Sequence, residues 1–222
     1  MEKAFCLAET EKSMTDNAKI ISSMMEELDR LGHIEAEDIP DIELYMDQVT
    51  SFMDQHLKNT SRKPDSDKIL TKTMINNYAK NDLLPAPDRK KYSKEHMILM
   101  IFIYYYKGVL SMSDIQQILG PVTEKFFRTD RQPDLETIYS TVFGEEPGEI
   151  ERIKKDVQDK YDRSRKLFCE LKEDDRNKLQ LFSFVCMMSY DVYIKKMLIE
   201  RMIDGMTDEG SKNAKGRKSG ET

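Results

Sequence analysis

Tryptophan is absent from this 222-residue sequence, and cysteine, histidine, proline and glycine are scarce, with 3, 3, 7 and 9 residues. Few helix breakers among many strong helix formers favour an all-α fold. The cysteines lie far apart and include no CxxC pair: Cys6, Cys169 and Cys186. This spacing favours reduced, packed thiols in a cytoplasmic protein over the alternatives of a disulfide or a zinc site.

Motifs of catalysis are missing as well. The sequence contains no P-loop, GxGxxG or GxSxG, and its histidines occur in no ligand spacing such as HExxH: His33, His56 and His96. Each histidine is expected at the surface or in a helix cap. Acidic pairs such as Glu145–Glu146 fall at predicted turns or helix starts, where capping accounts for them. We therefore expect no enzymatic activity, no cofactor and no bound metal.

Long hydrophobic runs are absent too. The two most apolar runs, 97–106 and 179–190, fall short of the roughly 20 residues that cross a bilayer, so both are expected to be buried helices. Residues 1–12 are polar and charged, unlike a signal peptide. The sequence thus predicts a cytoplasmic protein with no membrane partner.

Positive charge is concentrated in one segment of an acidic chain. The net charge is −6, yet the residues from Lys58 to Lys94 include ten Lys or Arg against four Asp, a local charge of +6. The remainder then carries −12. A basic patch on an acidic body suits DNA binding, although a solvated charged surface accounts for the charge equally well.

A helix is predicted from Thr71 to Asn81 within this basic segment, with Thr71 as its N-cap. Its apolar stripe consists of Met74, Ile75, Tyr78 and Ala79. Its polar side consists of Lys72, Thr73, Asn76, Asn77 and Lys80. Asn amides suit adenine edges and Lys suits guanine or phosphate, so this side could read the major groove. The alternative is a polar helix surface that binds nothing.

A basic turn follows this helix directly. Pro85 and Pro87 prevent the helix from continuing, and the next turn places three cations side by side: Arg89, Lys90 and Lys91. On a short wing, these cations would hold phosphates or enter the neighbouring minor groove. An amide-rich helix beside a basic turn is typical of a helix-turn-helix with a short basic wing.

Further helices are expected around this unit. One begins near Pro40 and would carry the stripe Ile42, Tyr45, Val49, Phe52 and Met53 as the supporting helix. Ser93 caps the buried central helix, in which residues 104–106, all Tyr, are either core or a stacking platform for bases. Ser111 or Ser113 begins the next helix, which Gly120–Pro121 is expected to end.

The remaining chain reads as a helical bundle. A helix from Thr15 or Asp16 to Leu31, a seam from Ile150 to Leu171, and a last helix near 174–203, buried on most sides, would form it. We predict four regions: an N-terminal helical segment (1–38), a winged helix-turn-helix-like DNA-binding domain (39–120), a C-terminal helical dimerisation or effector region (121–204) and a disordered tail (205–222).

The order of these pieces resembles the MerR-type winged helix. The matching pieces are the helix ending near Asn81, Leu83-Leu84-Pro85, a wing closing on Tyr92, and a helix capped by Ser93. MINNYAKNDLL and KKYSKEH also resemble an uncharacterised bacterial family, the YkrK-like domain of unknown function, over about residues 39–119. The resemblance implies DNA binding. The RYYE-like signature of the better-known MerR proteins reads NNYAK here. Their C-terminal metal-binding cysteines have no counterpart, so metal sensing is not implied.

The sequence therefore predicts a sequence-specific DNA-binding transcriptional regulator of bacterial type. Its expected partners are double-stranded DNA and a second copy, since palindromic sites are read by dimers; an unidentified small-molecule effector is a further option. The expected DNA contacts are Lys72, Thr73, Asn76, Asn77, Lys80, Arg89, Lys90 and Lys91. The alternative is a helical protein–protein interaction module without DNA binding, using the seam from Ile150 to Leu171.

Overall fold

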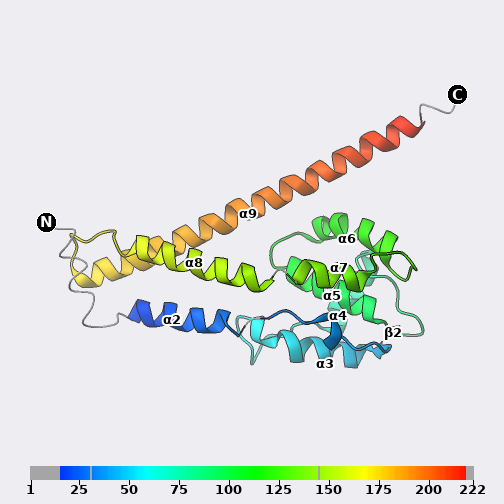
Figure 1. The fold of residues 1–222 in the computed structure, drawn as a ribbon, viewed down its shortest axis with the longest axis horizontal. Coiled ribbons are helices and arrows are strands. Elements are labelled where there is room, and N and C mark those ends of the chain that lie inside the picture. The colour runs from blue at the N-terminus through cyan, green and yellow to red at the C-terminus, as the bar shows by residue number, and fades with distance from the viewer. Residues whose placement is uncertain (1–15, 31, 145, 219–222) are drawn as a thin grey trace. The chain divides into compact units, whose positions relative to one another are not determined.

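The computed structural model describes residues 16–30, 32–144 and 146–218, and the side chains of 17–30, 32–144 and 148–206. The described chain is mostly helical, which confirms the all-α prediction, and it includes one two-stranded sheet (Figure 1). It divides into two compact units. Of the described residues, unit 1 contains 16–30, Gly32 and 146–195, and unit 2 contains 33–144 and 196–218.

Unit 2 contains the basic segment from Lys58 to Lys94. Its elements in chain order are η2 (Ala36–Asp38), β1 (Leu44–Tyr45), α3 (Met46–Leu57), η3 (Lys58–Thr60), α4 (Lys72–Lys80), β2 (Lys91–Tyr92), α5 (Lys94–Tyr106), α6 (Met112–Phe126) and α7 (Leu135–Phe143). Unit 1 contains α2 (Asp16–Leu28), α8 (Glu146–Ser164) and the first part of α9 (Glu173–Lys218), whose later part belongs to unit 2.

Helix α5 is the centre of unit 2. Ser93 is its N-cap, and the Ser93 backbone N–H donates to Nδ1 of His96, three residues on, at 3.0 Å. Every residue from His96 to Ile103 is buried, as an apolar sequence without a polar side requires. The prediction of a buried central helix capped by Ser93 is confirmed. The tyrosines at 104–106 are half-buried and pack against the same core, in agreement with the core alternative.

The helix predicted to begin near Pro40 begins only at Met46. The residues before it form β1, which pairs antiparallel with β2, so that Leu44 lies opposite Tyr92 and Tyr45 opposite Lys91. Leu44 and Tyr92 are both buried, so this pairing delivers two side chains to the core from segments far apart in sequence. Ile42 and Tyr45, expected in the core stripe, are exposed.

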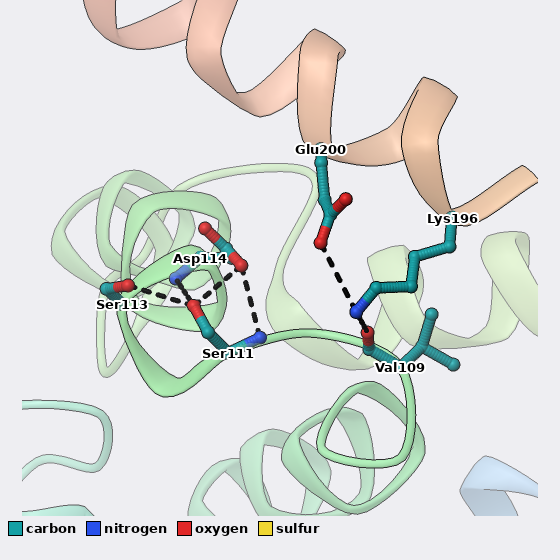
Figure 2. A network of polar contacts seen from close by, with 6 residues as sticks. All are labelled: Val109, Ser111, Ser113, Asp114, Lys196 and Glu200. Carbon is teal, nitrogen blue, oxygen red and sulfur yellow. Dashed lines mark hydrogen bonds and ion pairs between the residues drawn. The ribbon is translucent and has the colours of Figure 1, made fainter. Parts of the chain in front are cut away.

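Helix α6 begins where the sequence predicts but ends later. Ser111 caps it, with its hydroxyl accepting from the backbone N–H of Asp114 while the Asp114 carboxylate accepts from Ser111 (Figure 2). The predicted end at Gly120–Pro121 is wrong, because the helix continues to Phe126. Leu119 before the proline and Phe126 after it both pack on the core, and this packing outweighs the hydrogen bond that Pro121 removes. The boundary expected after residue 120 thus falls inside a helix.

The later part of α9 is seated on unit 2. The ammonium group of Lys196 donates to the Val109 carbonyl at 2.9 Å and pairs with Glu200 at 3.2 Å (Figure 2). Ile203 is buried in the unit 2 core. The helix then continues to Lys218, past its predicted end near Ile203 and into the segment expected to be disordered. The residues after Gly205 mix good helix formers such as Glu209 and Ala214 with Gly210 and Gly216, and the helix begun on a packed surface propagates through them.

Unit 1 has a small core. Helices α2 and α8 contact each other, and the buried side chains are Ile21, Val157, Tyr161 and Phe184. The seam predicted from Ile150 to Leu171 is buried at Val157, Tyr161 and Ser164. Ile153, and Leu167 and Leu171 beyond the end of α8, are more than one-third exposed. The turn predicted at 145–148 is helical from Glu146 onward.

The prediction that residues 179–190 form a buried helix is wrong, because Phe184 alone among them is buried. Cys186, expected to be packed, is also exposed. Across the described residues, no helix combines the length and the apolar content needed to cross a bilayer.

Candidate nucleic-acid interface

Helix α4 forms as the sequence predicts. Thr71 has an extended backbone, and its hydroxyl accepts from the backbone N–H of Met74 at 3.2 Å, which satisfies one free donor of the first turn. Ile75 and Tyr78 are buried in the unit 2 core, and burial raises the pKa of the Tyr78 hydroxyl. The buried stripe therefore fixes which side of α4 faces outward.

The outward side of α4 carries the predicted polar residues. All five are exposed: Lys72, Thr73, Asn76, Asn77 and Lys80. The side-chain amides of Asn76 and Asn77 make no hydrogen bond to any other described residue, and within the same part of the chain the Lys80 ammonium makes no ion pair. The amide groups are therefore available to a ligand in the arrangement that the sequence predicts.

The predicted wing is a tight hairpin turn. The Lys91 backbone N–H donates to the Asp88 carbonyl at 2.8 Å, and the two residues between them are left-handed, with φ of 48° at Arg89 and 65° at Lys90. Positive φ at both central residues is typical of a type I′ turn, for which Asn-Gly is the favoured sequence. A residue that has a side chain and adopts this left-handed backbone conformation destabilises the fold by about 1 kcal/mol. Both cations are exposed and without an ion pair in the described structure.

Residues 45–47 connect the hairpin to α4. Tyr45 pairs with Lys91 in the sheet, and the Lys91 ammonium lies 5.6 Å from the centre of the exposed Tyr45 ring, within cation–π range. Two residues later, the Asp47 carboxylate forms an ion pair with Lys72 in the first turn of α4. The hairpin and the N-terminal end of α4 are thus joined through one short segment.

Carboxylates divide the predicted cations into two classes. Lys72 is paired with Asp47, and Lys91 lies 3.9 Å from Glu43, which also meets Arg128 at 3.6 Å. These pairs partly neutralise Lys72 and Lys91. The unpaired cations of the candidate interface are Lys80, Arg89 and Lys90.

Sequence reasoning missed several of these residues. Glu43, Asp47 and Arg128 lie in other segments of the chain, and no local pattern shows that folding brings them to the interface. Tyr45 matched the apolar stripe of a helix and so was assigned to the core. No sequence signal separates Tyr45 from that stripe, because the later helix start at Met46 goes with the pairing of Leu44 and Tyr45 to a distant segment.

The long connection between α3 and α4 is folded rather than extended. The Asp67 carboxylate accepts from the Ser61 hydroxyl at 2.6 Å and from the Lys63 backbone N–H at 3.1 Å. At its end, the Lys107 ammonium donates to the Ile69 carbonyl at 3.0 Å, and burial lowers the pKa of Lys107. A groove of about 500 Å³ runs between α3 and the start of α4, lined by Thr50, Ser51, Asp54, Lys68 and residues 70–73.

His96 is buried and contacts Tyr92, the residue that follows the hairpin turn. Its ring packs edge-to-face on Tyr92 at 5.6 Å and on Phe127 at 4.8 Å between centroids. Burial lowers its pKa to about 4, and the positive charge of Arg128 acts in the same direction. His96 is therefore neutral at pH 7 and serves as a helix-cap partner. In the described residues, no group of three His, Cys, Asp or Glu side chains is arranged to hold a metal ion.

Comparison with known proteins gives one family match and no activity. Residues 34–142 match the model of a family described as Domain of unknown function (DUF1836). The match extends from η2 to α7 and includes the hairpin, α4 and the buried α5. Neither the curated proteins nor the solved structures contain a match to the chain. The expectation of a domain of unknown function is thereby confirmed.

Proposed function

We propose that unit 2 binds double-stranded DNA as the reading domain of a sequence-specific transcriptional regulator. In this proposal α4 enters the major groove and the Asp88–Lys91 hairpin lies on the phosphates beside it, in the manner of a MerR-like winged helix. The observation that carries the proposal is the turn itself: two exposed, unpaired cations occupy left-handed positions.

The strain of this turn argues for a role of its side chains. An Asn-Gly turn would join the same strands at lower conformational cost, so stability alone does not account for Arg89 and Lys90. Residues held in sparsely populated conformations cluster at functional sites. Their charge and exposure suit a polyanion, because each phosphate that a cation neutralises releases a counterion from the duplex.

The surface of α4 supports the same proposal. Its buried side and its N-cap hold the helix rigidly, while Asn76 and Asn77 present two amides one residue apart. An Asn amide can bond adenine with both its donor and its acceptor, and a Lys can bond guanine or phosphate. Lys72 and Lys91, already paired with carboxylates, would contribute less to the contact than Lys80.

The competing function is protein binding without DNA. The exposed apolar side of α9 favours an association with protein, but this side belongs to unit 1, whereas the basic turn and α4 belong to unit 2. A protein-interaction module would retain its partner at high salt. DNA retention would instead fall steeply as salt rises.

The test is selection of duplex DNA fragments by the purified full-length protein. The Asn76→Ala/Asn77→Ala variant should lose the enriched sequence, at about 1–3 kcal/mol for each base contact, while weak binding to any sequence persists. Lys80→Gln, Arg89→Gln and Lys90→Gln should each weaken binding to all sequences and reduce the slope of log K against log salt by about 0.9.

Lys72→Gln is the matched control, because this cation belongs to the same helix but is paired with Asp47. It should change the salt slope less than Lys80→Gln does. The proposal is overturned if the protein neither enriches a sequence nor retains duplex DNA at about 50 mM salt, where phosphate contacts are strong.

A further inference from the structure

One side of α9 within unit 1 is exposed and apolar. We define the α9 face as Phe182, Val185, Cys186, Ser189, Tyr190, Val192 and Tyr193. These residues recur every three or four positions and so lie along one side of the helix. The residues Phe182, Tyr190 and Tyr193 are 64%, 67% and 59% exposed. A row of large, exposed apolar side chains is typical of a surface that binds another molecule.

The opposite side of the same helix already serves the unit 1 core. Phe184 is buried there against Tyr161 of α8, with ring centroids 5.7 Å apart. Asp191 pairs with Lys160 of α8 at 3.5 Å. These contacts fix the rotation of α9 in unit 1, so the α9 face cannot turn inward without breaking them.

The α9 face is uncharged. Between Lys178 and Lys195 the only charged residue is Asp191, and its carboxylate is directed to Lys160 and Lys195. An uncharged side has no cation for a phosphate or a lipid headgroup. Aromatic side chains without charge are instead typical of the buried centre of a protein–protein interface.

The exposed area reaches the lower limit for a specific dimer interface. At about 200 Å² for a whole aromatic side chain, the three rings expose about 400 Å² together. Val185 and Val192, each more than half exposed, raise the α9 face to roughly 500 Å². Two copies would bury about 1,000 Å², the size at which specific interfaces begin. Unit 1 gains from this burial, because only four apolar side chains are fully buried in its described core.

We propose that the α9 face binds the α9 face of a second copy, with the two helices antiparallel about a twofold axis between residues 187 and 188. In this register Phe182 meets Tyr193 of the second copy, Val185 meets Tyr190, and Cys186 meets Ser189. Small residues lie at the axis, which lets the helices approach, and rings lie at both ends. The same patch serves both copies, as a twofold interface requires, and the helix dipoles oppose each other.

This interface does not depend on DNA binding. It would also supply the two copies that reading a palindromic site requires. The first test is therefore the mass of the full-length protein by sedimentation without DNA. The wild type should be a dimer at micromolar concentration, and Phe182→Glu/Tyr193→Glu should weaken the dimer at least about 100-fold, because it places like charges opposite each other in an apolar contact.

The control is Met202→Glu, which introduces one such charge at a residue 70% exposed on another side of the same helix. It should leave the dimer intact, and circular dichroism should show equal helix content in all three proteins. A monomeric wild type, or a dimer that survives Phe182→Glu/Tyr193→Glu, would overturn the proposal.

Cross-linking tests the antiparallel register in a protein whose three cysteines are replaced by serine. A mixture of the Phe182→Cys and Tyr193→Cys proteins should form a disulfide between copies under mild oxidation. Neither protein alone should do so. In this register residue 182 of one copy is offset by eleven residues, or roughly 16 Å along the helix, from residue 182 of the second copy, and the same holds for residue 193. Cross-linking of each protein with itself would show a parallel pair and overturn this register.

Discussion

Acidification should destabilise unit 2 through a single histidine. His96 is fully buried, and its pKa in the folded protein is about 4 against 6.5 for an ordinary histidine. Burial is the main cause, and Arg128 adds to it. Below pH 6.5 the unfolded chain therefore binds a proton that the folded chain does not. The free energy of unfolding falls as the pH falls from about 6.5 to about 4.

The magnitude follows from the difference between the two pKa values. A difference of about 2.5 pKa units corresponds to roughly 3 kcal/mol when both states have titrated, and about 2 kcal/mol of it is lost by pH 5. Other groups also titrate in this range, so the effect is measured as a difference between two proteins. The second protein is His96→Gln, because Gln at this position keeps an acceptor for the Ser93 backbone N–H.

The assay is urea unfolding followed by circular dichroism at pH 7.5 and pH 5.0. Between these pH values the wild type should lose about 2 kcal/mol more than His96→Gln loses, whatever the starting stability of the variant. An NMR titration of the imidazole resonance that disappears in the variant gives the pKa directly. Equal losses in both proteins, or an imidazole that titrates at 6.5 or above, would refute the reasoning.

Two further predictions concern stability at neutral pH. Lys90→Gly should raise the free energy of unfolding by about 1 kcal/mol in urea titrations, because glycine adopts positive φ without strain. The same variant should bind duplex DNA more weakly. Unchanged or lower stability would contradict the assignment of strain to this turn. Tyr139→Phe should lower the free energy of unfolding by about 1–3 kcal/mol, because the buried Ile34 carbonyl loses the hydroxyl that donates to it at 2.5 Å. A change within about 0.5 kcal/mol would show that this hydrogen bond contributes little.

Elements set by neighbouring residues could be predicted from the sequence. Thr71, Ser93 and Ser111 each cap a helix whose start the sequence places correctly, because a cap and its partner lie three residues apart. The outward side of α4 was also predictable, since the helical period alone separates Ile75 and Tyr78 from Asn76 and Asn77.

Features that depend on distant segments could not be predicted. The pairing of β1 with β2 joins residues 46 to 48 positions apart, so Leu44 and Tyr45 resembled the start of a helix. The ion pair between Asp47 and Lys72 could be identified only from the structure, because the two residues belong to different helices. The apolar run on α9 looked buried, because an apolar stripe has the same sequence whether its own chain or a second copy covers it.

The two-stranded sheet has a consequence for the order of folding. Joining Tyr45 to Lys91 closes a loop of 46 residues, whose entropy cost is about 3 kcal/mol before the constant part of the closure term. Two residues on each strand form too short a ladder to be stable alone. The strands therefore pair only once Leu44 and Tyr92 can reach the core around α5. The pairing of β1 with β2 is thus among the last contacts of unit 2 to form and among the first to open.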